Sequence, residues 1–461
     1  MKKLIIAAIG IVVIAALYCG ATWYSAVLAQ QRGAQMIERM TDRSRGMIKV
    51  VARKQQIHFF TASEDVTLSI NNPVIRQLIH TGVDESADTQ FTVHNDVAFG
   101  PFPGFRSVGM ARIETTLVLT PGQRKKLIAA IGTDQPLQFL TTLDYFGKSH
   151  FDVISSPLEF HSANKEEGGA WKGGRLRLNF TTDLAAATFN GSAPGLAVNG
   201  KDNSVLHVDE ITLNGAVQSR FEVLFTGNET FGVGNISFSD PAKADSAFMA
   251  KNLAYDIHST ADDQFINFGV AADSGEIAYK STHLKEAHFD FGTSHIDAKS
   301  LASLYKTVQD IQTKLLKQHD NANPESPSQQ ADDIKSKVTK DMLAILQHTP
   351  VLTLDNIGFA TADGSLKITG TATISDVAEE DISPEVQYQA LAKKIHAQAD
   401  ISIDQSLIDH WPVAADNAAQ MKQQISALES QGFVTRKGNR LESHIEYRDG
   451  KITANGKAVG G

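Results

Sequence analysis

The chain has 461 residues, of which 42% are hydrophobic and 21% charged, and its formal net charge is −9. This length and apolar content allow a sizeable core and roughly two or three domains. The acidic excess argues against nucleic-acid binding, which needs Lys and Arg side chains to neutralise phosphates. The one cysteine, Cys19, allows neither an intramolecular disulfide nor a cysteine-based metal site.

The N-terminal segment is the most apolar part of the chain. No charged residue occurs between Lys3 and Gln31. The most apolar stretch, Leu4–Tyr18, is short for a membrane span. Extended through Ala29, it reaches roughly the ~30 Å of a bilayer's hydrocarbon core at about 1.5 Å per residue.

Two interpretations of residues 1–29 stay open. They form an uncleaved membrane anchor with Trp23 and Tyr24 at the membrane–water interface. Alternatively, they form a secretory signal that is cleaved after Val27-Leu28-Ala29. Both interpretations export the rest of the chain, so we expect the body to lie outside the cytoplasm.

Residues 30–300 are predicted to be rich in β-strands. In GRLRLNF (174–180), apolar residues alternate with Arg and Asn, which indicates a strand with one face in water. SRFEVLF (219–225) and HLKEAHFDF (283–291) follow the same alternation. Glycine and Asn or Asp turns separate such segments at short intervals, which favours antiparallel strands over βαβ units.

The remaining region, 301–461, mixes helices and strands. Apolar residues spaced three and four apart predict an amphipathic helix over 297–318 and a second one from Ile334 to Ile345. A polar linker at about 318–332 separates them. We expect this helical hairpin to lie on the sheet; a homodimer contact through residues 297–346 is the alternative.

Strands return after Pro350, beginning with a hairpin around Asp363-Gly364. Ser383-Pro384 predicts the start of a helix, with Ser as the cap and Pro in the first turn. A last helix is predicted over about 413–430, ending near Gly432. A final hairpin turns at Asp449-Gly450.

The predicted fold class is therefore α+β and β-dominated. It has an N-terminal transmembrane helix, a large antiparallel β-sheet body and a few amphipathic helices in the C-terminal third. The expected organisation is an anchor or signal over 1–29, a β-rich periplasmic region over 30–300, and an α+β region over 301–461.

The stretch HNDVAFGPFPGF (94–105) combines two glycines and two prolines between Gly100 and Gly104. A phosphate-binding loop needs consecutive backbone N–H donors before a helix, but the prolines remove donors and a strand-like segment follows. We interpret the stretch as a corner between two strands, with Phe99, Phe102 and Phe105 packed beneath it.

Polar clusters give no specific sign of catalysis or metal binding. Three groups of polar residues are more typical of solvated or structural side chains than of a catalytic or metal site: His283, His288, Asp290 and His295; Asp144, His150 and Asp152 with Ser149 and Ser155; and the acids Glu166-Glu167 and Glu379-Glu380-Asp381. We therefore assign no catalytic, cofactor-binding or metal-binding residue, expect no cofactor, and predict that the protein is not an enzyme.

Several segments resemble the YdgA family of bacterial envelope proteins, whose biochemical role is not established. They are the apolar N-terminus, the GPFPG stretch, LAILQHTPVLTLDNIGFATADGSLKITG (343–370) and QGFVTRKGNRLESHIEYRDGKITANGK (431–457). The resemblance covers nearly the whole chain. It implies an inner-membrane anchor and a periplasmic β-rich body, and it supplies no catalytic residues.

The expected function is a membrane-anchored binding or scaffold role in the bacterial envelope. One hypothesis is that a lipid or another apolar ligand binds along an aliphatic sheet face. A second is a structural or assembly role as a homo-oligomer, and a hydrolase is the weakest alternative. An apolar sheet face left uncovered by helices would favour the first hypothesis, because monomeric proteins rarely expose large apolar patches.

Overall fold

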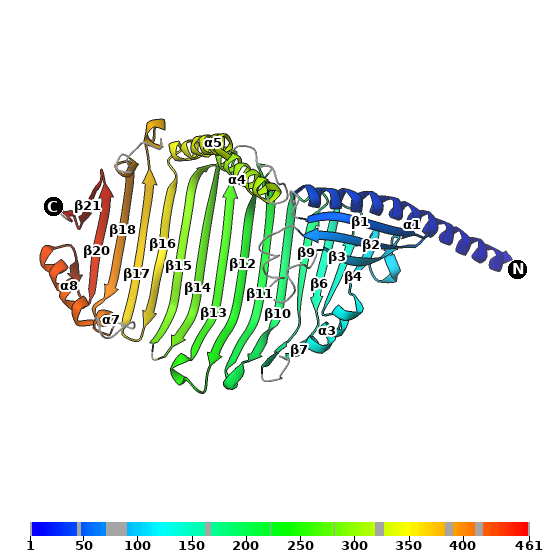
Figure 1. Ribbon diagram of the computed structural model, residues 1–461, viewed down its shortest axis with the longest axis horizontal. Helices are drawn as coiled ribbons and strands as arrows, with labels where there is room; N and C mark the ends of the chain where they lie inside the picture. The colour runs from blue at the N-terminus through cyan, green and yellow to red at the C-terminus, as the bar shows by residue number, and fades with distance from the viewer. Residues whose placement is uncertain are drawn as a thin grey trace. The chain divides into compact units, whose positions relative to one another are not determined.

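The chain forms two compact units, Met1–Gly195 and Leu196–Gly461, and each is built from antiparallel strands (Figure 1). The computed structural model describes residues 2–43, 48–70, 90–161, 167–221, 223–280, 282–318, 327–382, 391–410 and 418–459. The predicted β-dominated, antiparallel fold is confirmed. The three regions expected from the sequence stay a prediction.

The strands of the first unit pair in a meander, each antiparallel to the next one named. A short hairpin of β7 (Leu158–His161) and β8 (Gly168–Trp171) lies between β6 and β9 in the chain. The paired strands are β1 (Ile48–Ile57), β2 (Thr61–Ile70), β3 (Gln90–Phe99), β4 (Ala111–Val118), β5 (Leu137–Leu143), β6 (Lys148–Ser155), β9 (Gly174–Thr181) and β10 (Ala186–Asn199).

Helix α1 (Lys2–Arg43) continues well beyond the predicted anchor, and its second half packs on this sheet. Ala26 and Ala29 are buried in the main apolar cluster of the unit. The other buried members of that cluster come from the strands and from the residue before β4: Ala62, Phe99, Met110, Ala111 and Leu143. This part of α1 is therefore a core element.

Polar contacts fix the second half of α1 to the turns between strands. The Ser25 hydroxyl lies 2.6 Å from the Tyr145 hydroxyl. Arg32 donates to the Asp144 carbonyl oxygen at 3.0 Å, and Arg39 donates to the Thr182 carbonyl oxygen at 2.7 Å. These guanidinium groups bind backbone carbonyl oxygens of the first unit and hold this half of the helix against the strands.

The GPFPG stretch forms the expected corner between β3 and β4, with a 3₁₀ turn at Pro103–Phe105. Gly100 has φ +123°, and a Cβ there would lie 2.9 Å from Oγ1 of Thr22 on α1, so a glycine fits this position. The expected packing of the phenylalanines is only partly right. Phe99 is buried, whereas Phe102 and Phe105 are exposed.

The first unit also contains a helix that the sequence analysis did not predict, α3 (Pro121–Ile131). Thr120 caps it: its hydroxyl accepts a hydrogen bond from the Gln123 amide, and the Gln123 side chain accepts one from the Thr120 amide. Gly132, with φ +76°, ends the helix.

The second unit is also an antiparallel meander, in which each strand pairs with the next one named. Shorter strands β19 (Thr435–Lys437) and β21 (Lys451–Ala454) pair with β20, and β22 (Lys457–Ala458) pairs with β21. The long strands are β11 (Val205–Arg220), β12 (Leu224–Ser239), β13 (Phe248–Ala261), β14 (Phe265–Tyr279), β15 (Thr282–Asp297), β16 (Val351–Thr361), β17 (Gly364–Ile374), β18 (Ile395–Asp404) and β20 (Arg440–Arg448).

One predicted strand of this unit is wrong. SRFEVLF spans the hairpin turn between β11 and β12 instead of a single strand. Phe221 adopts φ 48°, and Phe221 and Val223 pack against a small apolar cluster at this end of the sheet. The apolar–polar alternation of the sequence therefore continues across the hairpin turn, and no Gly, Pro or Asn in SRFEVLF marks that turn.

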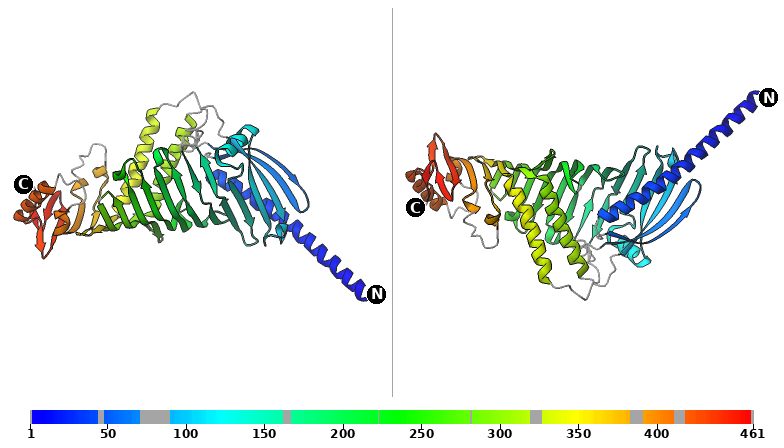
Figure 2. Two further views of the ribbon diagram at one scale, coloured as in Figure 1. Left: turned by 90° about the horizontal axis from the view of Figure 1, so that it is seen from below. Right: turned by 90° about the horizontal axis from the view of Figure 1, so that it is seen from above.

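Helices α4 (Ala298–Gln318) and α5 (Pro327–Gln347) form the predicted hairpin and lie side by side on one face of this sheet (Figure 2). The expected linker is too long by several residues, because α5 already begins at Pro327, a favoured first helical residue. The predicted helix at Ser383-Pro384 lies outside the described residues.

Two further helices belong to the second unit. The short α7 (Gln405–Asp409) buries Leu407 and Ile408. The last helix, α8 (Ala418–Gln431), is followed by Gly432 with φ +77°, as predicted. The final hairpin turns at Asp449-Gly450 between β20 and β21, also as predicted.

Candidate functional site

A row of apolar side chains crosses the second unit on one face of its sheet. Phe231 on β12 pairs with Tyr255 on β13, Tyr255 with Ala272 on β14, and Ala272 with Phe289 on β15. Directly paired residues point to the same face, so these four side chains are neighbours. Beyond β15 the same row continues through Ile357, Ile368 and Ile401.

Beside this row, residues with a left-handed backbone conformation interrupt the regular strand geometry and extend the apolar face. Glu210 and Asn252 adopt positive φ angles of 57° and 51°. A Cβ on Gly234 would lie 2.5 Å from Oε2 of Glu210, and one on Gly275 would lie 3.1 Å from Nδ2 of Asn252. The alternation of side chains between the two faces shifts by one position here. Val233 and Ile236, which are three residues apart, therefore line the same depression.

Helices α4 and α5 cover only one end of this apolar face. Ile266 is buried there against Ala298 and Ala302 of α4. Ile266 and Ala272 lie on the same face of β14, but they are six residues apart, about 20 Å at ~3.3 Å per residue. The middle of the face is left open: Phe231, Tyr255 and Phe289 are 44%, 42% and 43% exposed.

The open part of the face forms a shallow depression of about 390 Å³ over β12 to β15. Aliphatic side chains line it together with the three aromatic residues, among them Val233, Ile236, Leu253 and Ile277. The opposite face of these strands carries a Thr230–Asp256 hydrogen bond of 2.6 Å, and Asp273 and His288, which contact each other, also border the depression. We name Phe231, Tyr255, Phe289 and the aliphatic residues around them the apolar groove.

The sequence places Phe289 on one face of a strand, but it does not predict that Phe231 and Tyr255 lie beside it. The signal for Phe289 is the alternation in HLKEAHFDF, which correctly places Phe289 and Phe291 opposite His288 and Asp290. The partners of Phe289 on β12 to β14 depend on the register between strands, which a single sequence does not contain.

The polar groups considered at 144–155 are brought near one another, but each serves the sheet. Asp144 accepts the backbone amides of Phe146 and Lys148 at 2.8 and 2.7 Å, which shapes the turn. His150 contacts the Asn179 side chain at 2.6 Å, and its other ring nitrogen lies 4.0 Å from Asp144. No nucleophile contacts His150 in these interactions.

Asp152 is the most buried acid of this group. It accepts hydrogen bonds from Arg177 at 2.8 Å and Arg175 at 3.1 Å. Burial of the carboxyl acts to raise its pKa, but the hydrogen bonds from Arg177 and then Arg175 outweigh burial and hold the pKa of Asp152 below its ordinary value. The group is a charged cross-link between β6 and β9.

The histidines considered for a metal site are dispersed. His283 lies 3.4 Å from Glu276, His288 contacts Asp273, and the His295 ring lies 5.2 Å from the Phe265 ring. Within the described ranges, no three His, Cys, Asp or Glu side chains are grouped so that they could hold a metal ion. Of the paired acids, Asp381 binds Lys394, and Glu166 lies outside the described residues.

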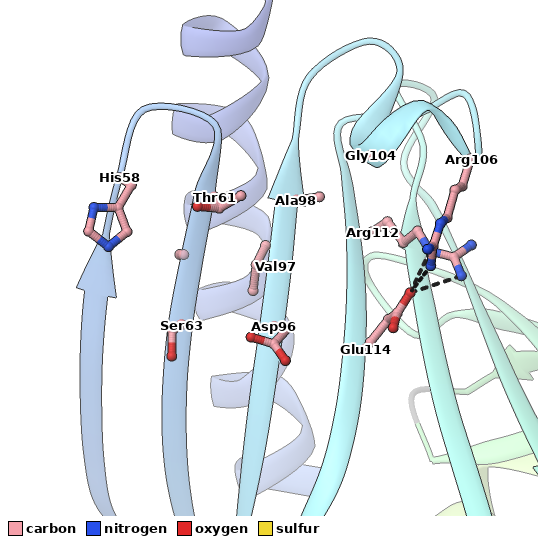
Figure 3. Close-up of a pocket in the computed structure, with 11 residues that line it drawn as sticks. His58, Thr61, Ser63, Asp96, Val97, Ala98, Gly104, Arg106, Arg112 and Glu114 are labelled. Carbon is pink, nitrogen blue, oxygen red and sulfur yellow. Dashed lines mark hydrogen bonds and ion pairs between the residues drawn. The ribbon is translucent and has the colours of Figure 1, made fainter.

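A second depression, of about 390 Å³, lies on the first unit beside the GPFPG corner (Figure 3). Arg106 and Arg112 converge there on Glu114, each with an N–O distance of 3.1 Å. Asp96 lines the same depression. The two guanidinium groups are already engaged by a carboxylate, which weakens any attraction for a phosphate, so this depression is a poorer candidate than the apolar groove.

The comparisons with known proteins give a family and no relative of known function. No curated protein and no solved structure matches the chain. The family described as "Bacterial protein of unknown function (DUF945)" matches residues 1–460. That match covers both units, α1 and the apolar groove, and the chain therefore belongs to the DUF945 family of bacterial proteins.

Proposed function

We propose that α1 anchors this protein in the bacterial inner membrane and that its body lies in the periplasm, as the resemblance to the YdgA family implies. The helix Val13–Arg39 contains an 18-residue window with a mean hydropathy of 1.3, long and apolar enough to cross a membrane. A signal sequence would pass the same test, so length and composition alone do not choose between an anchor and a cleaved leader.

The packing of α1 favours the uncleaved anchor. Cleavage after Ala29 would remove Ala26 and Ala29 from the core of the first unit, together with the hydrogen bond between Ser25 and Tyr145. A leader peptide that is discarded has no reason to supply buried core residues of the mature fold. The first unit is complete only when α1 stays attached.

The body of this protein then acts as a non-catalytic binding protein whose apolar groove holds an acyl chain of a lipid. The observation that carries this proposal is the exposure of Phe231, Tyr255 and Phe289 from three strands on one continuous apolar face. Water-exposed apolar surface costs about 25 cal/mol per Å², so an apolar occupant would stabilise the groove. The anchoring membrane supplies acyl chains.

The test compares two tyrosines of the second unit. Tyr255 lies in the groove, and Tyr279, at the end of β14, has a similar exposure but does not line it. The full chain, Tyr255→Asp and Tyr279→Asp would be purified from membranes and analysed by native mass spectrometry for bound phospholipid. We expect bound lipid on the unchanged chain and on Tyr279→Asp, and a loss of it on Tyr255→Asp.

The same experiment can reject the proposal. An unchanged chain that carries no phospholipid, or equal amounts on both tyrosine variants, contradicts a lipid site in the groove. Thermal unfolding of Tyr255→Asp would show whether a loss of lipid reflects a loss of fold instead. In that case Phe231→Ser serves as the second groove variant.

A second candidate function is a scaffold role as a homodimer through α4 and α5. The observation that favours it is the exposure of Tyr305 and Val308 on α4 and of Met342 on α5. Light scattering of the detergent-solubilised chain, together with a photo-crosslinking amino acid at position 305, tests this contact. A monomeric mass without a crosslinked dimer excludes it.

A further inference from the structure

Two loops of the first unit carry exposed apolar side chains beside α1. One is the turn 58–60 between β1 and β2, and the other is the GPFPG corner with the residues after it, 100–110, between β3 and β4. We name these two loops the aromatic tips. Phe105 is 84% exposed and Val108 is 71% exposed. The exposed apolar residues of the aromatic tips are Phe59, Phe60, Phe102, Phe105 and Val108.

The aromatic tips lie at the place where α1 leaves the first unit. The Tyr18 ring stacks with the Phe60 ring at 6.4 Å and with the Phe105 ring at 6.0 Å between centroids. The N-terminal part of α1 projects beyond the strands (Figure 2), and Ile14 and Leu17 in this part are both exposed. One residue of each tip therefore contacts α1 at Tyr18, where the free, apolar part of the helix begins.

The free part of α1 is too short to cross a bilayer. The uncharged run between Lys3 and Tyr18, Leu4–Leu17, has 14 residues, about 21 Å at 1.5 Å per residue. The hydrocarbon core is about 30 Å thick. The helix is therefore about 9 Å shorter than the hydrocarbon core. Either the bilayer becomes thinner around it, or part of the first unit enters the hydrocarbon region.

The aromatic residues of α1 indicate how the deficit is met. Leu4–Trp23 has 20 residues, about 30 Å of helix, and Trp and Tyr prefer the membrane–water interface. Trp23 and Tyr24 are 61% and 56% exposed, as this position requires. With Trp23 at the hydrocarbon boundary, Tyr18 lies about 7 Å inside it. Phe60 and Phe105, which stack on Tyr18, then lie at a similar depth.

The backbone of the longer tip suits an apolar environment. Pro101 and Pro103 have no N–H group. The amides of Gly100, Phe105 and Gly109 donate to carbonyl oxygens within the loop at 3.1, 2.9 and 3.2 Å. Each amide satisfied inside the protein lowers the cost of leaving water, because lipid offers no hydrogen-bond partner.

We propose that the aromatic tips insert into the bilayer leaflet nearest the body, where Phe60, Phe105 and Val108 contact acyl chains around α1. This inference rests on the membrane-anchoring part of the proposed function, and it does not depend on ligand binding in the apolar groove. It makes the first unit a monotopic membrane-binding unit in addition to an anchored one.

The test uses depth-dependent fluorescence quenching on the full chain. Cys19→Ser removes the native thiol, and single cysteines then replace Leu17, Phe105, Val108 or Ile128 and carry an NBD label. Ile128 is exposed on α3, at the opposite ends of β4 and β5 from the tips. Each protein is reconstituted into phosphatidylethanolamine–phosphatidylglycerol vesicles with or without doxyl-labelled phosphatidylcholine.

We expect the doxyl lipid to quench the labels at 17, 105 and 108, with blue-shifted emission, and to leave the label at 128 unquenched. Quenching at 17 without quenching at 105 and 108 overturns the insertion of the tips and leaves the anchor intact. A label at 17 that is not quenched overturns the anchor, and this inference with it. The two tip positions guard against a local effect of one substitution.

Discussion

At the scale of single residues, Asp152 shows how a buried charge is retained in the first unit. Its carboxylate is held by Arg175 and Arg177 across β6 and β9. Because its pKa is lower in the folded chain than in the unfolded one, it stabilises the fold above the unfolded pKa of about 3.9. That contribution is lost as pH falls through the lower, folded pKa.

We expect Asp152→Asn to destabilise the first unit by about 1–3 kcal/mol at pH 7, because hydrogen bonds to a charged group are lost. The variant should also lose less stability than the unchanged chain as pH is lowered below about 4. Hydrogen exchange of the β6 and β9 amides at several pH values would measure both effects.

Asp263→Asn, at an exposed turn of the second unit, is the control and should leave β6 and β9 unchanged. Equal exchange rates of these strands in Asp152→Asn and the unchanged chain would contradict the stabilising role of the carboxylate.

At the scale of elements, α3 depends on its cap. It has no buried residue, so little packing supports it, and the reciprocal hydrogen bonds of Thr120 and Gln123 carry much of its local stability. We expect Thr120→Ala to destabilise α3 by about 1 kcal/mol. Hydrogen exchange of residues 124–131 would report the change as faster exchange.

Thr120→Ser keeps a hydroxyl at the cap and should exchange close to the unchanged rate. If the alanine and serine variants exchange equally fast, the capping box does not stabilise the helix.

Much of the fold could be predicted from alternation and helical spacing. The strands at 174–180 and 283–291, the hairpin of α4 and α5 and the stop at Gly432 all follow from local sequence. The signals for α3 were also present, as Thr120-Pro121 and Gln123, but they lie among strand-like segments. SRFEVLF was wrong because alternation does not mark a turn without turn residues.

The candidate site was less accessible to sequence reasoning. An apolar sheet face is one hypothesis from the sequence. Its members, however, depend on how the neighbouring strands from β12 to β15 pair and on the left-handed residues Glu210 and Asn252. A left-handed residue inside a strand shifts the side-chain pattern by one position, and Glu is rarely found in that conformation. The exposure of Phe102 and Phe105 likewise depends on the path of a loop.

At the scale of the whole chain, α1 is both the proposed membrane anchor and a core element of the first unit. We expect a chain that starts at Gln30 behind a cleavable signal to lose the stability of the first unit, whereas a chain that starts at Tyr18 keeps it. Each buried CH₂ is worth about 0.8 kcal/mol, so losing Thr22, Ala26, Leu28 and Ala29 costs at least about 3 kcal/mol.

Limited proteolysis of both exported chains would measure this difference, with cleavage inside 48–195 expected only in the chain that starts at Gln30. Peptides from 205–297 serve as the internal control, because they belong to the second unit, Leu196–Gly461. Equal resistance of the two chains would show that α1 is dispensable for the first unit.

The unbroken helix from the apolar run into the core has a mechanical consequence. Helix α1 runs without interruption from the exposed Leu17 to the packed Ala26 and Ala29, with no proline and with Gly20 between them. If α1 anchors the chain as proposed, its tilt within the lipid would be passed to β1, β3 and β4, which it contacts, and the bilayer would set the direction in which the first unit points.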